Sequence, residues 1–110
     1  MYRVVGLEEE EAAYAETFTE ALRDFYVRCI EPISQGKKPQ NSETTCYIEA
    51  KGERTASRMY YPYVFEFAVK AGLIKNGILV EPLSEPSQTD LIAEFSRAAI
   101  LKMTEKMGCH

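Results

Sequence analysis

A stripe of apolar residues at helical spacing in the first third of the chain constrains the fold more than any other feature. Its members recur at steps of four, four, three and four residues: Tyr14, Phe18, Leu22, Phe25 and Cys29. Residues at that spacing share one face of an α-helix. We therefore predict a long helix over roughly 7–31, with Phe18 and Leu22 at the centre of its buried face. Pro32, which lacks an amide proton, is expected to end it.

A second helical pattern covers roughly 56–71. Its apolar face comprises Tyr60, Val64, Phe67, Ala68 and Ala71. Pro62 fits the first turn of a helix but would kink a helix already under way. Gly72 can adopt the left-handed conformation that ends a helix, with Leu73 packing back on the last turn.

The last third of the chain predicts a hairpin and a third helix. Asn76-Gly77 lies between short apolar runs, which is the pattern of a tight β-hairpin over 73–80. Ser87 and Asp90 resemble a capping box at the start of a helix over roughly 87–107. The predicted buried face of that helix contains Leu91, Ile92, Phe95, Ala98, Ala99 and Met103.

These patterns predict a mainly α fold for a single domain, 1–110. We expect a compact bundle of three long helices, to which a short fourth helix at 44–51 and the small β-hairpin can be added. The segment 44–51 also fits a strand with Cys46 and Ile48 on one face. The alternative is therefore an α+β fold in which Tyr2–Val5, Cys46–Ile48 and Ile78–Val80 form a minor sheet.

Charge and cysteine content narrow the functional class. The net charge of −4 disfavours bulk electrostatic capture of nucleic acid or of an anionic membrane, although residues 32–75 alone carry +3. We find neither a secretory signal pattern nor an apolar run long enough for a membrane helix, so a cytoplasmic location is expected. Three widely spaced cysteines, Cys29, Cys46 and Cys109, are an odd number, and reduced thiols are expected.

The sequence offers no catalytic, cofactor or metal motif. The single histidine is His110, and neither CxxC nor HExxH occurs, so we predict no metal site, no cofactor and no catalytic residue. Cys29 reads as a small core residue. Cys46 would be a reactive thiol only if the fold brought Lys51 or Arg54 close enough to lower its pKa.

The segment Lys51–Phe67 is the one unusual constellation, because it combines three cations with five aromatic residues. Arg and Tyr are enriched at binding hot spots. On a continuous helix, Arg54 and Arg58 would form a cationic strip beside Tyr61, and we predict that these three residues bind a partner.

The leading functional hypothesis is a small non-enzymatic interaction or regulatory protein that acts through protein–protein contacts. Self-association as a homo-oligomer is the simplest form, with Glu16, Glu20 and Asp24 as the complementary acidic residues. One alternative is a nucleic-acid-binding regulator that uses Lys51–Tyr63. The other is an enzyme whose site is built from Tyr, Arg and carboxylates without His.

Overall fold

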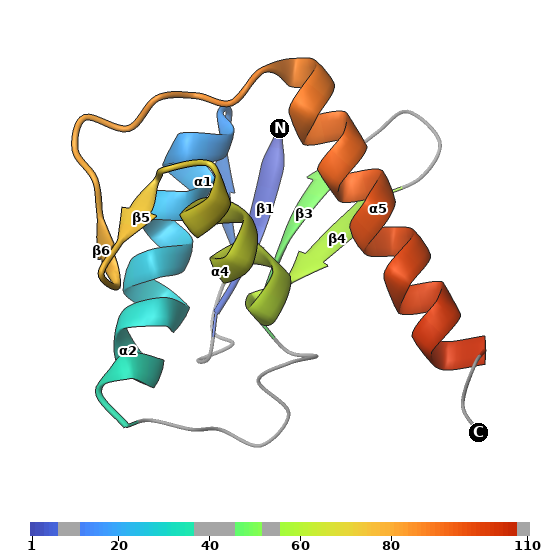
Figure 1. Cartoon of the computed structure of the whole chain (residues 1–110), viewed down its shortest axis with the longest axis horizontal. Coiled ribbons are helices and arrows are strands. Elements are labelled where there is room, and N and C mark those ends of the chain that lie inside the picture. Colours follow the sequence, from blue (N-terminus) through green and yellow to red (C-terminus); the bar gives the residue numbers. More distant parts are fainter. Residues whose placement is uncertain (7–11, 37–45, 52–55, 108–110) are drawn as a thin grey trace.

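The protein is an α+β domain, and the prediction of a mainly α bundle of three long helices is wrong. The computed structural model describes residues 1–6, 12–36, 46–51 and 56–107, with side chains described up to Ala98 except that of Ala56. Within these residues a four-stranded antiparallel sheet is covered by helices (Figure 1). The strands are β1 (Tyr2–Val5), β2 (Ala13–Ala15), β3 (Tyr47–Lys51) and β4 (Ala56–Tyr60), in the order β2-β1-β3-β4.

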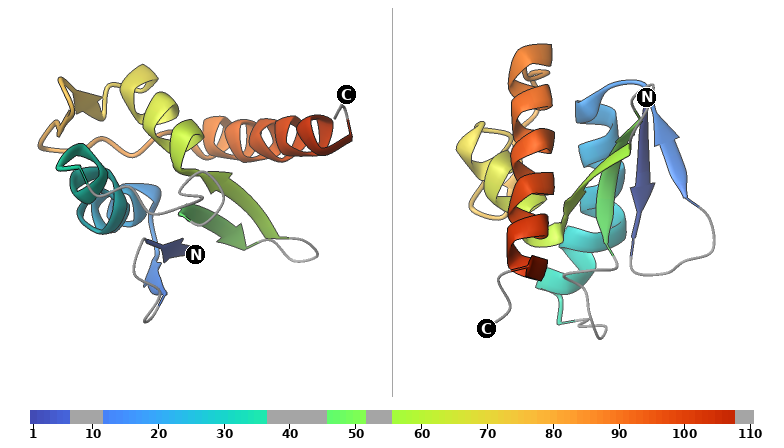
Figure 2. Two further views of the ribbon diagram at one scale, coloured as in Figure 1. Left: turned by 90° about the horizontal axis from the view of Figure 1, so that it is seen from below. Right: turned by 90° about the vertical axis from the view of Figure 1, so that its right-hand side faces the viewer.

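The helices all lie on one side of this sheet. A continuous helical segment comprises α1 (Phe18–Phe25), the π-helical turn η1 (Tyr26–Ile30) and α2 (Glu31–Ser34), and it is followed later by α4 (Tyr61–Lys70) and α5 (Gln88–Met107). Figure 2 shows α1, α4 and α5 on the same side, with no helix of the described chain against the other side. The first two strand pairs are each a hairpin followed by a helix, and β1 pairs with β3 at the centre of the sheet.

The predicted helix over 7–31 is corrected at both ends, and residues 7–11 lie outside the described residues. Tyr14 belongs to β2, where it pairs with Arg3, and α1 begins after Thr17. The Thr17 side chain accepts a hydrogen bond from the backbone N–H of Glu20 at 3.2 Å. Thr17-Phe18-Thr19-Glu20 thus has the spacing of a capping box, which marks the start of a helix. The apolar stripe extends past this point to Tyr14 and therefore did not indicate where the helix begins.

Pro32 does not end this helix, because the turn before it is π-helical. The backbone N–H of Glu31 bonds to the carbonyl of Tyr26, five residues back. Pro32 lies in the first turn of α2, directly after this π-helical turn. The helix continues to Ser34.

The predicted helix over 56–71 is a strand followed by a helix. Residues Ala56–Tyr60 form β4, and Pro62 occupies the first turn of α4. The short helix predicted at 44–51 is also wrong, because residues 47–51 form the central strand β3 between β1 and β4. Of the alternative minor sheet, Tyr2–Val5 does pair with residues 47–48 as β1 and β3, whereas Ile78 lies in a separate hairpin.

Three local predictions agree with the structure. The hairpin consists of β5 (Ile74–Lys75) and β6 (Ile78–Leu79), and both residues of its Asn76-Gly77 turn have positive φ. Gly72 has φ +79° and ends α4, while the N–H of Leu73 bonds to the carbonyl of Ala68 at 2.8 Å. The helix predicted over 87–107 is α5, where Ser87 accepts from the N–H of Asp90 at 3.1 Å.

The core lies between the sheet and the helices. Residues of β1, β3 and β4 enter it from the sheet: Tyr2, Val4, Ile48 and Met59. Phe18 and Leu22 are fully buried opposite them, as the apolar stripe predicts. Within α5, Leu91, Phe95 and Ala98 are buried but Ile92 is exposed, and the side chains of Ala99 and Met103 are outside the described part.

The segment before α5 is attached to the start of α1 by a carboxylate. Glu85 accepts hydrogen bonds from the backbone N–H groups of Phe18 at 2.9 Å and Thr19 at 2.8 Å. Both N–H groups belong to the first helical turn, which has no partner within the helix itself. Glu85 thereby fixes the long connection between the hairpin and α5.

Candidate functional site

The side of the sheet without helices carries the most distinctive group of side chains in the described chain. We call it the open face, and its defining residues are Arg3, Tyr14, Tyr47, Glu49, Lys51, Arg58 and Tyr60. Strand pairing brings them together, because Arg3 lies opposite both Tyr14 and Glu49, Glu49 opposite Arg58, and Tyr47 opposite Tyr60. Directly paired residues point to the same side of a sheet.

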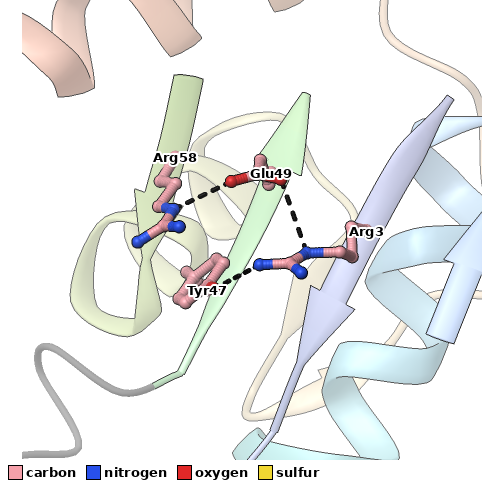
Figure 3. Close-up of polar contacts among 4 residues, drawn as sticks. All are labelled: Arg3, Tyr47, Glu49 and Arg58. Atoms are coloured by element: carbon pink, nitrogen blue, oxygen red, sulfur yellow. Dashed lines mark hydrogen bonds and ion pairs between the residues drawn. The ribbon is translucent and has the colours of Figure 1, made fainter. Parts of the chain in front are cut away.

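Glu49 is the centre of the open face. Its carboxylate accepts a hydrogen bond from Arg58 Nε at 2.8 Å and lies 3.4 Å from Arg3 Nε (Figure 3). The Glu49 side chain is only 6% exposed, against 29% for Arg3 and 45% for Arg58. A buried carboxylate is costly unless cations and hydrogen bonds compensate it, and the two guanidinium groups do so.

Tyr47 lies beneath the two arginines. Arg3 Nη2 donates to the Tyr47 hydroxyl at 2.7 Å, and the Arg58 guanidinium carbon lies 4.5 Å from the Tyr47 ring centroid. The ring of Tyr60 is 5.4 Å from that of Tyr47. The hydrogen bonds of Arg58 to Glu49 and then to Tyr60 raise the pKa of Arg58, so its charge is fixed. Both arginines are therefore held by charge, hydrogen bonds and ring contacts.

The charge of the open face is opposite to that of the whole protein. Arg3, Lys51 and Arg58 contribute three cations and Glu49 one carboxylate, a net charge of +2 on a chain of net charge −4. Lys51 Nζ lies 5.7 Å from the ring centroid of Tyr14, which is 57% exposed. The open face thus presents its cations and the Tyr14 ring to solvent, whereas Tyr60 is half-buried and Tyr47 is buried.

The three residues predicted to bind a partner do not form a helical strip, because 56–60 is a strand. Arg58 lies on the open face, whereas Tyr61 is half-buried, with its ring 6.4 Å from that of the core residue Phe25. Burial, and then the nearby Cys29 and Cys46 thiols, raises the pKa of Tyr61. Arg54 lies outside the described residues.

Sequence reasoning missed Arg3, Tyr47 and Glu49 as members of one site. A signal for two of them was present, because Tyr47-Ile48-Glu49-Ala50-Lys51 alternates aromatic or charged residues with apolar ones. That period of two is typical of a strand with one buried face. The contribution of Arg3 depends on the pairing of β1 with β3, which no local pattern encodes.

Cys46 is not placed for a reactive thiol. Cys29 and Cys46 are both fully buried and reduced, and Lys51 is exposed. The hydrogen bond with Cys46 and then burial raise the pKa of Cys29 above its ordinary value. Thiolate chemistry is disfavoured at such a position. Cys109 and His110 lie outside the described residues.

A second feature is a cavity of about 470 Å³ between α4, α5 and the segment that precedes α5. Its lining comprises Phe67, Lys70, Ala71, Ser84, Glu85, Pro86, Asp90, Ala93 and Glu94. Glu94 accepts a hydrogen bond from the Tyr63 hydroxyl at 2.7 Å and lies 3.9 Å from Lys70 Nζ. Neither Arg58 nor any other residue of the open face lines this cavity.

The Tyr63–Glu94 pair predicts a loss of stability at alkaline pH. Burial and the adjacent Glu94 raise the pKa of Tyr63 to about 12, whereas a tyrosine in an unfolded chain ionises near pH 10. Between these values the folded state holds the proton that the unfolded state has lost, so stability falls as pH rises. The contribution of the protonated Tyr63 to the stability of the fold is complete below about pH 10 and is lost as pH rises through about 12.

We expect Tyr63→Phe to make the decline of the urea midpoint between pH 10 and pH 12 shallower than in the wild type. Tyr2 and Tyr61, whose pKa values are also raised mainly by burial, account for the part that remains. Midpoints measured at several pH values from 8 to 12 check this. Equal slopes for the two proteins would show that the Tyr63 proton is not linked to folding.

Over the residues with described side chains, no group of three or more His, Cys, Asp or Glu is arranged to hold a metal ion. No helix in the described part of the chain has the length and apolar character needed to cross a membrane. Comparison with protein-family models, with curated protein sequences and with solved structures finds no match to this chain.

Proposed function

We propose that this protein is a non-enzymatic binding protein that engages an acidic segment of another protein on the open face of its sheet. The observation that carries the proposal is the composition of that face. Three cations and three tyrosines occupy paired positions on four strands, away from the core. Arg and Tyr combine large contact area with hydrogen-bonding ends, and they are enriched at binding hot spots.

Charge favours an acidic partner over a second copy of this chain on the same surface. Two open faces brought together would place Arg3, Lys51 and Arg58 of one copy against the same cations of the other, and like charges across an interface are unfavourable. An acidic segment is attracted by the local charge of +2. Contacts between charged groups at short range outweigh the distant acidic residues, because salt screens interactions beyond about 8 Å at physiological ionic strength.

Single-stranded nucleic acid is the second candidate, and the exposed ring of Tyr14 favours it. Bases stack on aromatic side chains of sheet surfaces, and a basic groove follows the backbone. Two of the three cations, however, share the carboxylate of Glu49. A chain of net charge −4 also repels a polyanion more strongly than it repels a short acidic peptide.

The test compares binding of fluorescent poly-glutamate and of a fluorescent single-stranded oligonucleotide at 0.15 M salt by anisotropy. The variant is Arg58→Glu, and the matched control is Arg23→Glu. Arg23 is also an exposed arginine paired with a glutamate, Glu81 at 2.8 Å, but it lies on α1. Both substitutions change the net charge equally.

We expect wild type and Arg23→Glu to bind poly-glutamate alike, and Arg58→Glu to bind at least about tenfold more weakly. Equal weakening by the two substitutions would show that only net charge matters and would refute the open face as the site. Preferential binding of the oligonucleotide, abolished by Arg58→Glu, would identify the open face as a site for nucleic acid instead. A salt-dependent dimer in native mass measurements would instead support self-association.

A further inference from the structure

The buried carboxylate of Glu49 has a geometric effect on the arginines that its charge alone does not explain. Both guanidinium groups turn the same atom, Nε, toward it, at 2.8 Å for Arg58 and 3.4 Å for Arg3. In the described residues, Arg3 Nε has no hydrogen-bond partner, so the ion pair with Glu49 is its compensation. Figure 3 shows Glu49 between the two arginines, with the terminal nitrogens of Arg58 directed away from it.

Part of the terminal side of each guanidinium is engaged within the open face, by Tyr47 for Arg3 and by Tyr60 for Arg58. The remaining terminal N–H groups can receive another group. A guanidinium has five N–H donors in a rigid plane, and its terminal N–H groups match the two oxygens of a carboxylate. Tyr47 supports both planes, through a hydrogen bond to Arg3 Nη2 at 2.7 Å and through the ring beneath Arg58. Side chains that are already ordered lose less entropy when a ligand binds.

The net charge of the cluster formed by Arg3, Arg58 and Glu49 is balanced by a single negative charge. Arg3, Arg58 and Glu49 together carry +1, so one carboxylate neutralises them. A phosphodiester is also a monoanion, but it comes with a chain of further charges that the acidic protein repels. This charge balance therefore favours one Asp or Glu side chain of the partner as the ligand.

We propose that Glu49 is a positioning residue that holds Arg3 and Arg58 as a two-arginine site for one carboxylate side chain of the partner. This inference rests on the proposed function and assigns the point where the acidic segment is anchored. Glu49 does not touch the ligand. Its effect is transmitted through the orientation of the two guanidinium groups.

Glu49→Gln separates positioning from simple charge, because the two effects have opposite signs. The variant raises the charge of the open face by one, which on charge alone would tighten the binding of an anion. If Glu49 positions the arginines, binding weakens despite the added charge. The probe is an acetylated tetraglutamate amide, with affinity and the Nε–H resonances of the arginines followed by NMR.

We expect Glu49→Gln to bind the tetraglutamate about tenfold more weakly, with the Nε–H resonance of Arg58 shifted before any peptide is added. The amide resonances of the rest of the chain should stay at their wild-type positions, which shows that the fold is retained. Unchanged or tighter binding by the folded variant would overturn the inference. An oligonucleotide that displaces the tetraglutamate and binds more tightly would overturn the assignment to a carboxylate.

A second variant keeps the inference testable if Glu49→Gln does not fold. Arg58→Lys retains the charge but removes the planar fork, and Arg23→Lys is its matched control on α1. We expect Arg58→Lys to weaken tetraglutamate binding about fivefold or more and Arg23→Lys to leave it unchanged. Equal affinities for the two lysine variants would refute a site that depends on guanidinium geometry.

The outcome for Lys51→Glu distinguishes this inference from the proposed function. Lys51 lies on the open face but does not contact Glu49, Arg3 or Arg58 in any interaction of the described residues. Weaker binding by Lys51→Glu together with tighter binding by Glu49→Gln would leave the proposed function standing and remove the positioning role. Failure of the wild type to bind any acidic peptide would remove the proposed function itself.

Discussion

Phe18→Ala is expected to lower the free energy of unfolding by about 3–5 kcal/mol, a large part of the roughly 5–15 kcal/mol of a domain this size. Phe18 is completely buried at the first turn of α1. Its ring centroid lies 5.9 Å from that of Tyr2, 5.5 Å from that of Phe67 and 6.2 Å from that of Phe95. These three rings come from β1, α4 and α5, so the truncation leaves a cavity where three elements meet.

Urea denaturation followed by circular dichroism measures this loss. Val27→Ala is the control, because Val27 lies on the same helical segment and is 59% exposed, so its truncation should cost less than about 0.5 kcal/mol. A wild-type midpoint for Phe18→Ala would mean that the ring is not part of the core. Equal losses for both variants would point to helix propensity rather than to packing.

Periodicity predicted the helical core because those residues are buried where a helix places them. Phe18, Leu22, Phe25 and Cys29 are all fully buried on α1 and η1. Tyr14 continues the same spacing by coincidence, since it lies on β2 and is 57% exposed. Spacing alone cannot show where a helix begins, whereas the Thr17 capping signal does.

The sheet was only the alternative prediction, because its strands are short and its central pairing, of β1 with β3, is not local. A strand of three to five residues, the length of each of β1 to β4, gives too few repeats for a period of two to stand out from its neighbours. Besides the neighbouring β4, β3 pairs with β1, whose residue Arg3 is 44 positions from Tyr47. Tertiary pairing therefore overrides the weak local preference of 44–51 for a helix.

The candidate site could be predicted in composition but not in geometry. Arg58 was identified from the density of arginine and tyrosine around it, and it does lie on the open face. Its partners Glu49 and Arg3 come from other strands, so only the sheet register brings them together. Tyr61 was grouped with Arg58 on the basis of a helix that begins only at Tyr61 itself.

Gly6→Ala is expected to destabilise the protein by about 1–3 kcal/mol through a steric clash between β1 and the helical segment. Gly6 is buried directly after β1, and a Cβ atom there would lie 2.6 Å from Arg28 Cβ and 3.1 Å from the Arg28 carbonyl oxygen. Neither atom is the free end of a flexible side chain, so the backbone must move to relieve the contact. Gly6 thus sets the distance at which η1 passes the end of the strand.

A double-mutant cycle with Arg28→Gly identifies this clash as the cause. Arg28→Gly removes the nearer contact atom and by itself should cost about 1 kcal/mol, because glycine weakens a helix. Gly6→Ala should then cost at least about 1 kcal/mol less in the Arg28→Gly background than in the wild type, since the two residues touch.

Gly72→Ala provides the contrast. A Cβ there meets no atom within 4 Å, but φ is +79°, so its cost of about 1 kcal/mol comes from backbone strain and should be unchanged by Arg28→Gly. If Gly6→Ala also costs the same in both backgrounds, the strand does not approach η1 closely enough to exclude a methyl group, and the tight packing of Gly6 on Arg28 is refuted.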